Sequence, residues 1–116
     1  MNFSIFEVYY MEIFFNNDEL EKLYENGKPT SKDLKSNPTL VNQFLKTMKK
    51  LMSISRVEQL NQFGGLHYEK LTGDRKGESC VRLNKQFRLI FIEMEDDSDT
   101  PKVVALRIEK ISKHYE

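Results

Sequence analysis

Apolar side chains recur at every second position through residues 81–91, which is the spacing of one face of a β-strand. The residues with this spacing are Val81, Leu83, Phe87, Leu89 and Phe91. Arg82 and Arg88 fall between them, so they share the opposite face of a predicted hairpin. Two arginines on one open face are either solvated or bind an anion such as a phosphate.

A turn precedes this hairpin at residues 72–77, where two glycines and an aspartate separate apolar runs. Glycine accepts positive φ and aspartate bonds back to the main chain, so turn geometry explains Gly73, Asp74 and Gly77. The same turn places Arg75 and Lys76 at the rim of the arginine face.

Helical spacing dominates the part of the chain before this turn. Asn16 and Glu19 have the spacing of a capping box and predict a short helix that ends at Gly27. Asn37 followed by Pro38 predicts the start of a second helix. The apolar stripe of that helix comprises Leu40, Val41, Phe44, Leu45, Met48, Leu51 and Met52. Its outer side carries three lysines that are either solvated or in contact with nucleic acid, namely Lys46, Lys49 and Lys50.

A short helical turn and a strand are predicted to follow the second helix. Ser55 and Glu58 repeat the capping-box spacing, and two consecutive glycines end the turn. Residues 66–71 then resume a strand pattern.

Both ends of the chain favour extended structure. Residues 1–15 are rich in aromatic and β-branched side chains, and the first ten are consistent with an N-terminal extension. Toward the C-terminus, residues 93–100 predict an acidic loop and residues 102–108 a last strand. The whole pattern predicts one α+β domain over residues 1–116, with an N-terminal strand and two or three helices packed on an antiparallel β-sheet.

The charge of the chain is balanced overall but uneven along the sequence. The chain has 18 basic and 18 acidic residues, so its net charge gives no indication of a nucleic-acid partner. Residues 66–92 nevertheless carry an excess of basic side chains, and a local basic face attracts polyanions. The basic residues in this segment are Lys70, Arg75, Lys76, Arg82, Lys85 and Arg88.

The few cysteines and histidines exclude some classes of protein. A single cysteine, Cys80, excludes an internal disulfide, fits a reducing cytoplasm and is expected to be a buried, inert thiol. Two histidines without a CxxC pair do not favour a structural metal site, and we expect no cofactor. The aromatic N-terminal stretch is interrupted by Glu7 and Glu12, so it predicts neither a signal peptide nor a membrane span.

Two motifs carry a resemblance to a known family. The run L-x-G-D-R-K-G-x-x-x-V-R-L-N-x-x-F-R-L-I-F, followed at the chain end by I-x-x-I-S-K-H-Y, resembles the HigB-type toxins of the RelE/ParE superfamily. The match covers the second half of the chain in detail and the first half only in its helix pattern. It implies the α+β fold of that superfamily, which contains both messenger-RNA interferases and gyrase inhibitors.

The resemblance also implies a set of site residues. Arg88 matches the arginine that interferases direct into their concave RNA-binding face, where a guanidinium can offset phosphate charge, and Arg82 has a supporting position. His114 and Tyr115 match, in exchanged order, the terminal tyrosine and histidine that contact the scissile nucleotide. The residues expected to bind RNA are Lys70, Arg75, Lys76, Arg82 and Lys85.

The chain departs from the family pattern just before the turn. The positions of a family histidine and a family lysine fall on Glu69 and Thr72. Lys70 could supply a replacement cation and Glu69 a base. His67 remains open between a partly buried strand residue and an RNA contact.

The resemblance implies a toxin of a type II toxin–antitoxin pair that is cytoplasmic and inhibits translation. The implied activity is a ribosome-dependent, metal-independent endoribonuclease that leaves 2′,3′-cyclic phosphate ends on messenger RNA. The expected partners are a helix-turn-helix antitoxin, the ribosome and messenger RNA, and the toxin is expected to be monomeric within the toxin–antitoxin complex. The alternatives are a ParE-like inhibitor of DNA gyrase and a degenerate relative that only binds its antitoxin.

Overall fold

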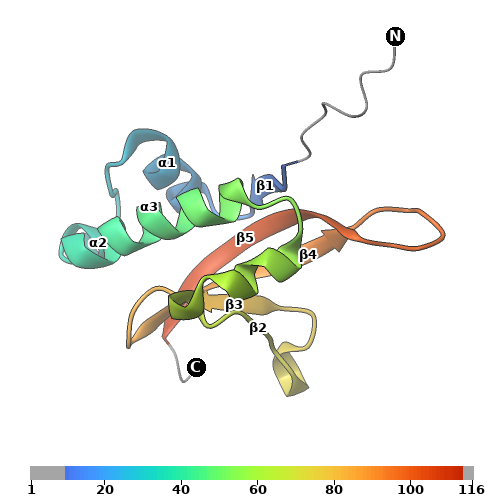
Figure 1. Cartoon of the computed structure of the whole chain (residues 1–116). Helices are drawn as coiled ribbons and strands as arrows, with labels where there is room; N and C mark the ends of the chain where they lie inside the picture. The colour runs from blue at the N-terminus through green and yellow to red at the C-terminus, as the bar shows by residue number, and fades with distance from the viewer. Residues whose placement is uncertain (1–9, 114–116) are drawn as a thin grey trace, which may run out of the picture.

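The computed structural model describes residues 10–113, which form a five-stranded sheet with helices on one face (Figure 1). The helices and strands, with the short 3₁₀ helices labelled η, are β1 (Glu12–Phe15), α1 (Asp18–Asn26), α2 (Lys32–Lys35), α3 (Pro38–Ser53), η2 (Val57–Gln62), η3 (Gly64–Leu66), β2 (Glu69–Lys70), η4 (Gly73–Arg75), β3 (Ser79–Arg82), β4 (Phe87–Glu95) and β5 (Val103–Lys113). This architecture confirms the predicted α+β class. None of the helices in this part of the chain has the length and apolar character needed to span a membrane.

The sheet contains one parallel pair that the sequence pattern did not predict. The strand order is β1-β5-β4-β3-β2, and β1 runs parallel to β5 whereas the other neighbours are antiparallel. Parallel neighbours need a long crossover connection, and the chain supplies one because the helices and three strands lie between β1 and β5. The predicted antiparallel arrangement is confirmed for β2 to β5, and the N-terminal strand, whose partner the sequence pattern left open, joins this sheet in parallel.

Helix α1 begins one residue later than the capping pattern predicts. The side chain of Asn17, not of Asn16, accepts a hydrogen bond from the backbone N–H of Leu20 at 3.1 Å. Asn16 still belongs to the sheet, because its own backbone N–H donates to the carbonyl of Ile108 at 2.8 Å. The helix ends as predicted at Gly27, whose φ of 70° is accessible to glycine without steric cost.

Helix α3 begins where the sequence predicts it. The side chain of Asn37 accepts a hydrogen bond from the backbone N–H of Leu40 at 3.2 Å, and Pro38 occupies the first helical turn. Most of the predicted apolar stripe is buried or half-buried, but Met52 is 38% exposed and lies outside the core. The predicted outer residues are exposed, namely Lys46, Lys49 and Lys50.

The segment between α3 and β2 differs most from its prediction. Ser55 is not a helix cap, because its backbone N–H donates to the side chain of Gln59 at 2.8 Å and the 3₁₀ helices η2 and η3 follow. His67 then adopts a φ of 46°, in the left-handed region, so an extended strand cannot begin before it. The strand predicted for residues 66–71 shrinks to the two residues of β2.

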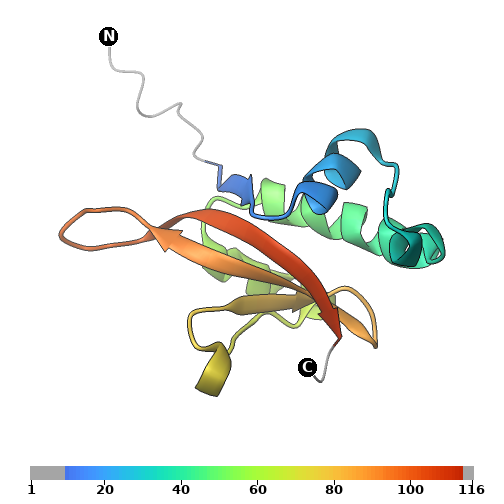
Figure 2. The same ribbon diagram turned by 180° about the vertical axis from the view of Figure 1, so that it is seen from behind.

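The last two strands are longer than predicted. Strand β4 includes Glu93 and Glu95, which the acidic pattern assigned to a loop, and β5 continues to Lys113. Pairing between the strands explains the extension, because Glu95 still lies opposite Val103. The β4–β5 hairpin projects beyond the other strands (Figure 2).

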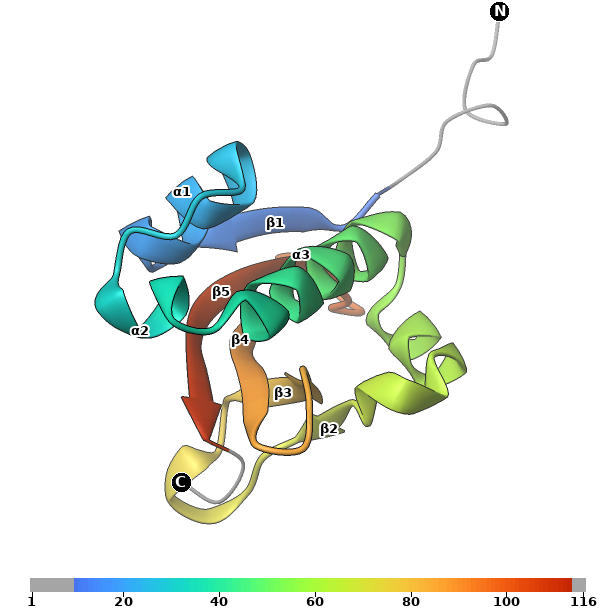
Figure 3. The same ribbon diagram turned by 90° about the vertical axis from the view of Figure 1, so that its left-hand side faces the viewer.

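The core lies between the helices and one face of the sheet. Helices α1, α2 and α3 lie on the same side of the strands (Figures 1 and 3). The buried sheet residues of this core are Val81, Leu89, Phe91, Leu106 and Ile108. No described helix covers the opposite side, which carries Cys80, Arg82, Arg88 and Ile90. We call that side the open face because no described helix packs on it, although Cys80, Arg88 and Ile90 are themselves buried.

Candidate active site

Two arginines come together on the β3–β4 hairpin. Arg82 and Arg88 are direct partners in the register, which confirms that they share a face. Asn84 closes the turn between them, because its side chain accepts hydrogen bonds from the backbone N–H groups of Gln86 and Phe87, both at 2.8 Å. Like charges directly opposite each other destabilise a sheet, so this pair favours an anion beside it.

Arg88 is buried, which argues against the solvated alternative for this face. Its residue surface is only 7% exposed. The reason is its place on a central strand, with Arg82 opposite it on β3 and Ser112 opposite it on β5. Water screens a charge less in such surroundings, so Arg88 acts strongly on any negative group that reaches it.

A cleft of about 320 Å³ opens beside the two arginines. Its lining residues are His67, Tyr68, Glu69, Cys80, Arg82 and Arg88. They come from β2, β3, β4 and the turn before β2, so three adjacent strands and one turn build the cleft at an edge of the sheet. We call it the arginine cleft.

Glu69 and Cys80 face each other in the arginine cleft. They are register partners between β2 and β3, and the Cys80 thiol donates to Glu69 Oε1 at 3.8 Å. Burial and then the Glu69 carboxylate raise the pKa of the Cys80 thiol, against a smaller opposite effect of Arg88. The thiol therefore stays protonated, in agreement with its predicted inert character. Glu69 is the carboxylate of the cleft.

His67 brings an imidazole to the same cleft from an unusual backbone conformation. Residues other than glycine rarely adopt its φ of 46°, and such conformations cluster at functional sites. The sequence analysis left His67 open and named Glu69 only as a replacement base. A sequence signal for the cleft does exist, because His67 and Glu69 alternate before the turn as Cys80 and Arg82 do after it. This alternation could have placed the four side chains on one face, but β2 is too short for the pattern to be recognised.

The other residues expected to bind RNA lie outside the arginine cleft. Lys70 is on the opposite side of β2, where its Nζ lies 3.8 Å from Glu93 Oε1. Arg75 forms an ion pair with Glu78, with 2.7 Å between Nε and Oε1. Lys76 and Lys85 are exposed on the turns that flank β3.

The two C-terminal candidates, His114 and Tyr115, lie outside the described residues. They follow Lys113, which ends β5, and Ser112 is the register partner of Arg88. The described chain therefore ends next to the arginine pair.

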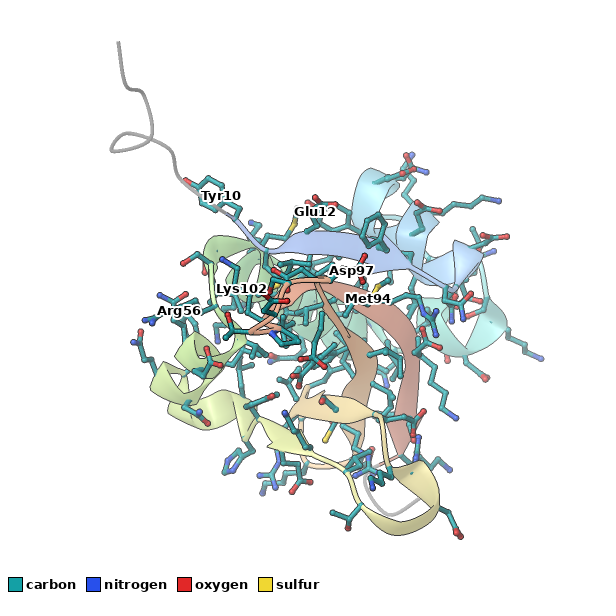
Figure 4. The ribbon with its side chains drawn as sticks, turned by 90° about the vertical axis from the view of Figure 1, so that its right-hand side faces the viewer. Tyr10, Glu12, Arg56, Met94, Asp97 and Lys102 are labelled. Carbon is teal, nitrogen blue, oxygen red and sulfur yellow. The ribbon has the colours of Figure 1, made fainter. Side chains whose placement is uncertain are left out.

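A second and larger cleft, of about 900 Å³, lies at the base of the β4–β5 hairpin. Figure 4 looks onto this end of the molecule, with Tyr10 and Glu12 at β1, Arg56 before η2 and Lys102 on the hairpin. Acidic and basic side chains alternate around it, and no two of its cations are register partners. The arginine cleft is the better candidate for acting on a phosphate.

No cluster of three or more histidine, cysteine, aspartate or glutamate side chains that could hold a metal ion occurs within residues 10–113. The charged groups of the arginine cleft are instead two guanidinium groups and one carboxylate. These groups can bind a phosphate, offset a developing negative charge and accept a proton.

Comparisons with known proteins agree with this fold. The structure of YafQ from Escherichia coli strain BL21(DE3) is similar with a TM-score of 0.51 and 15% identity, over 90% of this chain and 94% of YafQ. The YoeB/ParE toxin from Agrobacterium tumefaciens is similar with a TM-score of 0.51 and 16% identity, over 90% of this chain and all of that one (100%). No curated protein sequence matches the chain. The sequence profile described as "RelE-like toxin of type II toxin-antitoxin system HigB" matches residues 13–103, and the chain therefore belongs to the HigB-like toxin family.

Proposed function

We propose that this HigB-like toxin is an endoribonuclease that cuts messenger RNA on the ribosome and so inhibits translation. The observation that supports the proposal most is the arginine cleft, where a buried and a half-buried arginine face each other beside Glu69 and His67. The cleft combines phosphate-binding and proton-transferring groups in a space of about 320 Å³.

The proposed reaction is attack by a ribose 2′-oxygen on the adjacent phosphorus. A base removes the 2′-OH proton, the new O2′–P bond forms, and the bond from phosphorus to the 5′-oxygen breaks. The leaving oxygen takes a proton, and the products are a 2′,3′-cyclic phosphate and a free 5′-OH. Arg88 offsets the extra negative charge that develops on the phosphate, with Arg82 in a supporting position.

Four residues are candidates for the two proton transfers. Glu69 can act as the base because it is the carboxylate of the arginine cleft, and His67 can donate or accept a proton near pH 7. His114 and Tyr115 of the family motif remain proposed contributors. Together these groups account for the chemistry with protein side chains alone, so we propose a metal-independent reaction without a cofactor.

The ribosome and the antitoxin are assigned to different surfaces. The exposed Lys76 and Lys85, with Arg75 nearby, flank the hairpin of the arginine cleft and are suited to contact ribosomal RNA. The helix layer of residues 16–52 lies on the other side of the sheet and is proposed to bind a helix-turn-helix antitoxin. Hydrogen exchange of the isolated pair should then show protection in the helices, and protection restricted to β3 and β4 would contradict this assignment.

The test compares naked messenger RNA with messenger RNA on programmed ribosomes, both in the presence of a chelator. We expect purified protein to leave the naked RNA intact, because positioning on a scaffold alone can lower a barrier by roughly 7–11 kcal/mol. The ribosome-bound RNA should be cut and carry cyclic phosphate ends. Intact RNA on the ribosome together with inhibited supercoiling by gyrase would instead favour a ParE-like activity.

A further inference from the structure

Few backbone hydrogen bonds hold strand β2 in place, although its residue Glu69 lines the arginine cleft. It lies at the edge of the sheet and contains two residues, Glu69 and Lys70. These two residues pair with Cys80 and Ser79 of β3. Beyond them, the backbone N–H of Leu71 donates to the backbone carbonyl of Glu78 at 2.9 Å. So short an edge strand opens easily, because local unfolding begins where few hydrogen bonds hold the backbone.

A buried carboxylate on the covered side of the sheet supplies the missing restraint. Glu93 of β4 has a side chain only 9% exposed. The hydroxyl groups of Tyr68 and Ser79 both donate to its Oε2 at 2.5 Å. Its Oε1 is also buried and lies 3.8 Å from the Nζ of Lys70, which is too long for a direct hydrogen bond.

These contacts hold the two neighbours of Glu69 in the chain. Tyr68 and Lys70 both reach Glu93 on the helix side of the sheet. Side chains alternate along a strand, so Glu69 between them is directed to the open face and toward Cys80. The ring of Tyr68 is fixed further by stacking on Phe91, with 6.3 Å between the ring centroids.

We propose that Glu93 is a positioning residue, which holds β2 through Tyr68 and Lys70 so that Glu69 and His67 remain in the arginine cleft. This inference rests on the proposed function for its catalytic consequence. A carboxylate removed from water is costly for a fold unless donors surround it, and an apolar side chain would pack at the same site. The role of the carboxylate is therefore to fix Tyr68 and Lys70 in one arrangement.

The state of Tyr68 supports the same inference. Burial, and then the hydrogen bond to Glu93, raise the pKa of Tyr68 well above its usual range. The phenol, which is protonated at neutral pH in any case, therefore also stays a donor to Glu93 in alkaline solution.

The test uses Glu93→Gln and Tyr68→Phe, with Glu95→Gln as the matched control on an exposed site of the same strand. We expect both test variants to lower kcat on ribosome-bound messenger RNA by roughly tenfold while KM changes little, because only the placement of proton-transferring groups is altered. The control should keep the wild-type rate. In the background of Glu69→Gln, the change Glu93→Gln should cause a smaller loss than in the wild-type background, because part of its effect passes through Glu69.

Hydrogen exchange gives a readout that does not depend on cleavage. In Glu93→Gln, the amide of Leu71, which donates to the carbonyl of Glu78, should exchange at least about tenfold faster than in Glu95→Gln, because the restraint on β2 is lost. Unchanged exchange in β2 would overturn the positioning role even if the wild-type protein cut no RNA. Fully additive losses of kcat in the double variant would also overturn it. Failure of wild-type cleavage with faster exchange in β2 would refute only the proposed function.

Discussion

Strand β4 carries a charged side chain on each face of the sheet, and the two differ in what surrounds them. Glu93, on the helix side, accepts hydrogen bonds from two hydroxyl groups of the protein. Arg88, on the open face, lies beside a second arginine and lines a cleft. The first charge is hydrogen-bonded within the fold and serves its geometry. The second adds to a like charge and is suited to an anion from outside.

The largest effect is expected from Arg88→Met, which removes the charge on the open face but keeps much of the side-chain volume. Cleavage of ribosome-bound messenger RNA should fall by about 10²–10³-fold, because a group that offsets transition-state charge is lost. Thermal stability should be unchanged or higher, because an apolar side chain often replaces a buried charge at no cost. Lys28→Met, on the exposed loop after α1, is the control. A cleavage rate within a factor of about two of wild type would refute the role of Arg88.

On the helix side, loss of the charged side chain should act mainly on the stability of the fold. Glu93→Ala leaves the hydroxyls of Tyr68 and Ser79 buried without their acceptor, which costs about 1–3 kcal/mol for each unsatisfied group. Urea unfolding should show this loss, and Glu95→Ala should show almost none. Equal stability of the two variants would mean that the Glu93 contacts do not stabilise the fold.

The binding of an anion to the open face can be measured without any cleavage assay. Inorganic phosphate should raise Tm because it binds the arginine cleft of the folded protein. At a phosphate concentration ten times its Kd, the free energy of unfolding should increase by about 1.4 kcal/mol. Arg82→Gln should lose most of this gain, whereas Lys85→Gln should keep it. A phosphate-dependent rise of Tm that survives in Arg82→Gln would place the anion elsewhere.

The smallest effects should come from two of the positions with left-handed backbone, His67 and Gly27. His67→Gly removes a side chain from a φ of 46°, so stability should change by no more than about 1 kcal/mol while cleavage falls. Gly27→Ala introduces a side chain at a φ of 70° and should cost about 1 kcal/mol with normal cleavage. Parallel melting curves and cleavage assays measure both. A His67→Gly variant that cuts normally would exclude a role for the imidazole.

The sequence predicted the elements whose signals are local. Alternation through residues 81–91 located the β3–β4 hairpin and the shared face of Arg82 and Arg88, because period-two spacing fixes the face of each residue. The pair Asn37 and Pro38 located the start of α3 for the same reason, since capping depends on a few adjacent residues.

Features that depend on distant parts of the chain could not be predicted in this way. In η2 the apolar pattern is a single pair, Val57 and Leu60, which indicates a helical turn but is too short to predict a 3₁₀ helix. The conformation of His67 depends on the packing around it. The burial of Arg88 follows from strands on both sides of it. Glu93 looked like part of an acidic loop because its partners, Tyr68 and Ser79, are remote in sequence.

The parallel pairing of β1 with β5 has a consequence for the order in which the sheet can form. The first described strand cannot pair until the last described strand has been synthesised, so the β1 edge of the sheet forms late. Contacts between remote segments also slow folding. The burial of Arg88 depends on the same strand, because β4 lies between β3 and β5 and Ser112 of β5 is the register partner of Arg88. The β3–β4 hairpin, whose strands are adjacent in sequence, can therefore form before its arginine pair is enclosed.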